Sequence, residues 1–108
     1  MKTGLYAAHF ITAQGSGAGV VNLSENRLRG GDAALYYIGD YTLDGESFRA
    51  TVRTARHTQI EDIESVFGVD EVEIHLNGKW TGNMITAEGT SPQAPGVRFQ
   101  AHLKWLSD

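Results

Sequence analysis

The sequence predicts a mainly β protein: an eight-stranded antiparallel up-and-down β-barrel with one short α-helix. The 108 residues are enough for one domain, so residues 1–108 form a single barrel domain. Thirteen glycines against two prolines suit short strands joined by tight turns. Several runs alternate apolar and polar residues, as strands with one buried face do. A sandwich remains the alternative, but only a barrel removes every exposed strand edge.

Glycine-containing breaks divide the chain into the expected strands. The alternation is clearest near the end of the sequence, where Val97, Phe99 and Ala101 are separated by polar residues. Asp44-Gly45-Glu46 predicts a hairpin turn, and Asn77-Gly78 predicts another. The expected strands cover residues 5–13, 20–23, 27–29, 35–43, 47–55, 71–76, 83–88 and 97–105.

Residues 58–67 break the alternating pattern. Ile60, Ile63 and Phe67 recur at three- and four-residue spacing, which is typical of an amphipathic helix. Thr58 with Glu61 three residues later matches a capping box. The sequence therefore predicts one short helix here.

Catalytic and metal-binding patterns are missing from the sequence. There is no cysteine, and the four histidines lack metal-ligand spacing. The glycines of residues 15–19 lead into a strand rather than the helix that a dinucleotide-binding loop requires. We therefore expect no enzyme, no catalytic residue, no metal and no cofactor.

Charge and hydropathy set the expected location and partners. The net charge of −4 disfavours direct contact with nucleic acid. No apolar run is long enough for a membrane helix, and the first residues do not resemble a secretory signal, so we expect a cytoplasmic protein.

Six of the thirteen acidic side chains fall within residues 61–73, and arginines mark residues 49–56. These two groups either neutralise each other across strands or leave an acidic patch for a basic partner.

Aromatic residues suggest a ligand cavity as one of two possibilities. The rings either fill the core or line a cavity for an apolar ligand, with a tyrosine hydroxyl as its polar contact. The residues expected at such a cavity are Tyr6, Phe10, Tyr36, Phe48, Phe99 and Trp105.

The amino-terminal half resembles the GrlR-like family, which is named for a negative regulator of bacterial type III secretion genes. The resemblance covers residues 4–56. It is carried by Gly4-Leu5-Tyr6 with Phe10, by Gly17-Ala18-Gly19-Val20-Val21, and by Gly30-Gly31-Asp32 ahead of Tyr36 and Gly39. It implies a lipocalin-like barrel with an apolar interior, commonly a homodimer. It also implies a non-enzymatic function: binding a transcriptional activator and holding it away from promoters.

Family resemblance further implies that exposed acidic residues on the turn after the Gly-Gly-Asp strand contact the activator. Here that turn retains two charges, Asp44 and Glu46, which we therefore expect to bind the protein partner. The leading hypothesis is thus negative regulation of transcription by sequestering an activator. The alternative is a lipocalin-like carrier or sensor with a small apolar molecule in its barrel.

Overall fold

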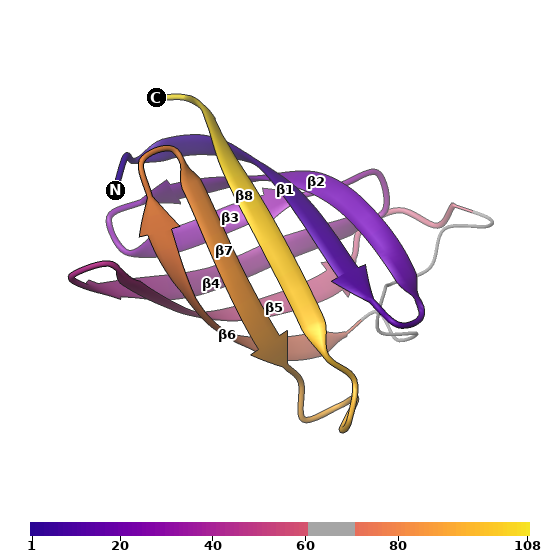
Figure 1. The fold of residues 1–108 in the computed structure, drawn as a ribbon. Coiled ribbons are helices and arrows are strands. Elements are labelled where there is room, and N and C mark those ends of the chain that lie inside the picture. Colours follow the sequence, from indigo (N-terminus) through magenta and orange to yellow (C-terminus); the bar gives the residue numbers. More distant parts are fainter. Residues whose placement is uncertain (61–70) are drawn as a thin grey trace.

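The computed structural model is a closed barrel of eight antiparallel strands, in which each strand pairs with the next and β8 pairs with β1 (Figure 1). It describes residues 1–60 and 71–108. The strands are β1 (Gly4–Thr12), β2 (Gly15–Ser24), β3 (Arg27–Gly31), β4 (Leu35–Asp44), β5 (Ser47–Arg56), β6 (Val72–Thr81), β7 (Met84–Thr90) and β8 (Phe99–Ser107). The predicted eight-stranded antiparallel barrel is confirmed.

Side chains alternate between the interior and the solvent, as the sequence pattern predicted. In β5, for example, Phe48, Ala50 and Val52 are buried, whereas the residues between them are exposed. The register places inward positions opposite each other: Val52 pairs with Gly39 of β4 and with Ile74 of β6. Because the sheet closes on itself, these inward residues share one core.

The two ends of the barrel differ. At one end lie both chain termini and the β2–β3, β4–β5 and β6–β7 turns (Figure 1). Its interior holds the four largest fully buried side chains: Tyr6, Leu23, Phe48 and Ile85. Tyr41 stacks on Phe48 with ring centroids 5.7 Å apart. We call this the plugged end, and the opposite end, which carries the β1–β2, β3–β4 and β7–β8 connections, the open end.

The predicted helix over residues 58–67 is not part of the described structure. Residues 61–67 lie outside the described residues, and the described part of the chain contains no helix. Thr58 does not begin a helix with its hydroxyl as a cap. Its Oγ1 lies 2.5 Å from Nδ1 of His57, and its backbone N–H donates to the carbonyl oxygen of Ala34 at 3.3 Å. The chain here is therefore anchored to the β3–β4 connection.

The turn predicted at Asn77-Gly78 is wrong. Strand β6 continues through both residues, and the chain turns at Gly82-Asn83 instead. Gly78 faces inward, where a Cβ atom would lie 2.1 Å from the carbonyl oxygen of Thr86 on β7. The glycine is therefore needed because two strands approach closely.

No helix among the described residues has the length and apolar character needed to cross a bilayer.

Replacing Gly78 with alanine tests the close approach of β6 and β7. We expect Gly78→Ala to lower the free energy of unfolding by about 1–3 kcal/mol, because the added methyl group overlaps backbone atoms of β7. Urea denaturation measures the change. Lys79→Ala, at the exposed neighbouring position, is the control and should stay within about 0.5 kcal/mol of the wild type. Equal stabilities for the two variants would contradict this account of Gly78.

Candidate functional site

The open half of the barrel interior contains a cavity of about 230 Å³. Its wall is formed mainly by inward apolar side chains from seven of the strands. These are Phe10, Val21, Leu28, Leu35, Val52, Ile74, Leu76, Phe99, Ala101 and Leu103. An engineered apolar cavity of about 150 Å³ holds benzene, so this one has room, by proportion, for roughly nine non-hydrogen atoms.

An aromatic cluster forms one side of the cavity. The ring of Phe10 stacks on Phe99, with centroids 5.5 Å apart and an interplanar angle of 26°. The same ring meets Tyr37 edge-to-face, with centroids 5.4 Å apart and an interplanar angle of 86°. Such contacts hold the rings in fixed orientations, so this part of the wall is preformed.

A phenol–carboxylate pair lies in the same wall. Tyr37 is only 5% exposed, and its hydroxyl donates a hydrogen bond to Oδ2 of Asp32. Both residues line the cavity. The pair is therefore a polar group of fixed geometry within an otherwise apolar wall.

Asp32 owes its position to the β3–β4 connection. Its Oδ1 accepts hydrogen bonds from the backbone N–H groups of Ala34 at 2.9 Å and Leu35 at 2.8 Å. Aspartate favours such turns because its short side chain reaches the backbone two or three residues on. His57, after β5, then holds this connection from outside: its Nε2 lies 2.9 Å from the carbonyl oxygen of Asp32, and its backbone N–H donates to Ala34 at 2.8 Å.

The environment of Tyr37 keeps its hydroxyl protonated. Burial raises the pKa of Tyr37 well above its ordinary value of 10.0, and the hydrogen bond to Asp32 and the charge of that carboxylate raise it further. In the physiological range the phenol is therefore a neutral donor to Asp32.

Gly19 of β2 makes room for the Tyr37 hydroxyl. A Cβ atom at this position would lie 2.9 Å from the hydroxyl oxygen and 2.6 Å from the carbonyl oxygen of Gly31. A side chain at position 19 would therefore displace the hydroxyl or the neighbouring strand.

The six residues predicted to line a cavity occupy three different places. Phe10 and Phe99 lie in the cavity wall. Tyr6 and Phe48 fill the plugged end. Trp105 is half-buried at that same end, where its Nε1 donates to the carbonyl oxygen of Thr3 at 3.2 Å. Tyr36 differs from expectation, because it points outward and is 41% exposed.

Sequence reasoning missed Asp32 and Tyr37, the polar members of the cavity. One signal for Asp32 was present, since an aspartate directly after two glycines is typical of a residue that caps a turn. No comparable signal separates Tyr37 from Tyr36, because Leu35 to Ile38 form an unbroken run without polar alternation.

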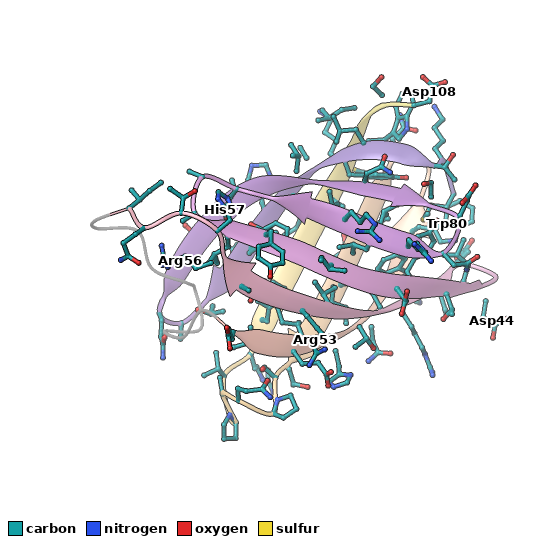
Figure 2. The ribbon with its side chains drawn as sticks, turned by 180° about the vertical axis from the view of Figure 1, so that it is seen from behind. Asp44, Arg53, Arg56, His57, Trp80 and Asp108 are labelled. Atoms are coloured by element: carbon teal, nitrogen blue, oxygen red, sulfur yellow. The ribbon has the colours of Figure 1, made fainter. Side chains whose placement is uncertain are left out.

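Asp44 and Glu46 lie far from the cavity, on the β4–β5 turn of the plugged end. Figure 2 shows Asp44 at the tip of this hairpin, and Arg56 and His57 at the opposite end of the barrel. Trp80 of β6 fixes the turn: its Nε1 donates to the carbonyl oxygen of Gly45 at 2.9 Å, and its backbone N–H donates to Glu46 at 3.0 Å. The acidic turn is thus exposed and held in place.

Within residues 1–60 and 71–108, no three His, Asp or Glu side chains gather as a metal site would require. The chain matches no protein-family model and no curated protein.

The pH dependence of stability tests the environment of Tyr37. Its contribution to stability is fully present below about pH 10, the ordinary tyrosine pKa, and is lost as the pH rises above it. The reason is that the unfolded chain then releases a proton that the folded chain retains. We expect Tyr37→Phe to reduce this alkaline loss, by up to about 1.4 kcal/mol per pH unit. Urea denaturation at several alkaline pH values measures it.

Tyr36→Phe provides the matched control, since it removes an exposed tyrosine from the adjacent position. Its stability should follow the wild-type pH profile. Parallel profiles for wild type and Tyr37→Phe would show that Tyr37 does not resist ionisation.

Proposed function

We propose that the protein binds a small, largely apolar molecule inside its barrel. The observation that carries this proposal is the cavity of about 230 Å³ at the open end. The plugged end is filled by large rings and aliphatic groups, and the cavity lies between them and the open end. A close-packed core normally leaves few voids larger than a water molecule, which makes a space of this size unusual.

The distribution of polar groups supports a ligand site. Ligand pockets are mostly apolar with a few well-placed polar groups, and this cavity follows that pattern. The deeper part of the cavity is lined by apolar residues such as Leu76 and Leu103. The lining side chains that can form hydrogen bonds all lie near the open end of the barrel: Ser16, Asp32, Tyr37 and Thr54. A ligand would therefore bind with its apolar part inside and its polar part toward the opening.

The size of the cavity sets the expected affinity. A ligand of about nine non-hydrogen atoms that binds with about 0.5–0.9 kcal/mol per atom, between the limits for drug-sized and very small ligands, gains about 4–8 kcal/mol in total. We therefore expect dissociation constants of roughly micromolar to millimolar for such ligands.

Filling the cavity tests the proposed function. Ala101 lines the cavity and is 2% exposed, so Ala101→Leu places three additional carbon atoms inside it. Native mass spectrometry of gently purified wild-type protein should show a bound small molecule, and Ala101→Leu should lose it or bind it at least about tenfold more weakly.

Ala7→Leu is the matched control, since it adds the same group at an outward position of β1. It should retain the ligand, and both variants should keep the far-ultraviolet circular dichroism of the barrel. An empty wild-type barrel that also binds no added apolar compound would contradict the proposal.

Negative regulation of transcription by sequestering an activator is a second proposed function. It rests on the resemblance to the GrlR-like family and on the exposed acidic turn. Among the described residues, no hydrogen bond or ion pair engages the carboxylates of Asp44 or Glu46, and Leu43 beside them is 42% exposed. An exposed apolar side chain flanked by charge, on a turn fixed by Trp80, suits contact with a basic partner.

Charge reversal tests this second function. Asp44→Lys with Glu46→Lys should weaken capture of an activator by about tenfold or more, because like charges then oppose its Arg and Lys side chains. The melting temperature should stay unchanged, since both side chains are exposed. A pull-down with a candidate activator measures capture. Asp40→Lys, on the outer face of β4 away from the turn, is the control, and undiminished capture by the double variant would exclude this contact.

A further inference from the structure

The hydrogen-bonding capacity of the Asp32–Tyr37 pair determines what kind of polar group it can receive. The Tyr37 proton is already committed to Oδ2 of Asp32. Oδ1 of Asp32 already accepts two backbone N–H groups. A carboxylate has about four acceptor positions and a phenol oxygen keeps a lone pair after donating, so the pair has spare lone pairs and no spare proton.

The charge at this position reinforces the same preference. Asp32 carries a negative charge, and no lysine or arginine is among the described residues that line the cavity. Arg56, at the end of β5, donates from its guanidinium to the carbonyl oxygen of Thr58 at 3.3 Å and does not line the cavity. A second carboxylate would therefore meet a like charge in a partly apolar setting, where such repulsion is stronger than in water.

We infer that the cavity selects ligands whose polar end donates a hydrogen bond, a hydroxyl or a protonated amine, and rejects those that end in a carboxylate. This inference rests on the proposed ligand-binding function. The hydroxyl of Ser16, which also lines the cavity, does not reverse it, because a hydroxyl group rotates to serve either partner. The donor end lies against Asp32 and Tyr37, and the apolar part extends toward Leu103, the cross-strand neighbour of the fully buried Ile85.

Four linear probes of about nine non-hydrogen atoms test the inference, since this is the size that the cavity holds by proportion. They are 1-octanol, octylamine, octanoate and heptyl methyl ether. The ether matches 1-octanol in size but has no proton to donate. Isothermal titration calorimetry near pH 7, where the carboxylate is ionised and the amine protonated, measures each affinity.

For the wild type, we expect 1-octanol, octylamine or both to bind at least about tenfold more tightly than the ether and octanoate, the effect of one hydrogen bond to a charged group. The comparison of 1-octanol with octylamine shows whether the donor is a hydroxyl or an ammonium group.

Asp32→Asn should reverse the preference while preserving the turn. The asparagine oxygen can still accept from Ala34 and Leu35, but its amide group donates to Tyr37. The Tyr37 proton then becomes available to the ligand, and the negative charge is gone. We expect octanoate to bind about tenfold more tightly to this variant than to the wild type. Tyr37→Phe leaves the Asp32 carboxylate as the acceptor and should keep the preference for 1-octanol over octanoate, as should Tyr36→Phe at the exposed neighbouring position.

Thermal melts show whether each variant is folded. If the wild type binds 1-octanol no more tightly than octanoate or the ether, and octylamine shows no advantage either, the inference is overturned while the proposed function stands. If no probe binds, and native mass spectrometry shows no difference in bound small molecule between Ala101→Leu and the wild type, the inference and the proposed function are both overturned.

Discussion

Closure of the sheet by pairing β8 with β1 is the constraint on which the rest of the structure depends. It leaves none of the eight strands with an unpaired edge, and it directs every second side chain into one shared interior. The interior must then be filled from a fixed set of positions. The plugged end is filled by Tyr6, Leu23, Phe48 and Ile85. Position 78 is a glycine because β6 and β7 leave no room there for a side chain. The open half has small residues at some of its inward positions, such as Val52 and Ala101, and there the space remains.

Closure also explains why the polar site forms where it does. Asp32 lies in a connection rather than in a strand, so its side chain is free of the inward–outward alternation and can turn into the barrel while capping its own turn. Tyr37 points inward because of the alternation of β4. Its hydroxyl reaches the carboxylate of Asp32 through the space that Gly19 leaves open. His57, from the end of β5, then ties down the same connection. Residues from four segments therefore meet where the consecutive strands β2 to β5 lie side by side.

Much of the fold could be predicted from the sequence, because alternation is a local property. Strand β5 and the first part of β8 read directly as half-buried strands. The sequence does not show which residues of β4 face inward, since Leu35 to Ile38 are all apolar or aromatic. The prediction put Tyr36 inside the barrel, whereas Tyr37 is the buried residue and Tyr36 is exposed. Asn77-Gly78 carries the composition of a turn, but pairing with β5 and β7 keeps it extended. The cavity site was even less accessible, because the contact between Asp32 and Tyr37 depends on how the β3–β4 connection folds over the open end.

The same alternation decides the charge inside the cavity. Arg27 and Arg29 of β3, with Arg49 and Arg53 of β5, all occupy outward positions, as Figure 2 shows for Arg53. Each is the direct neighbour in sequence of an inward side chain such as Leu28 or Val52, so a shift of register by one residue would exchange them. Basic residues are therefore numerous on the strands that surround Asp32, yet their side chains face solvent and none enters the described cavity wall. A barrel recognises a carboxylate through inward hydrogen-bond donors, and most strongly through an inward cation. Here the register excludes a cation from these strands, so the charge in the described cavity wall is that of Asp32, which comes from the β3–β4 connection.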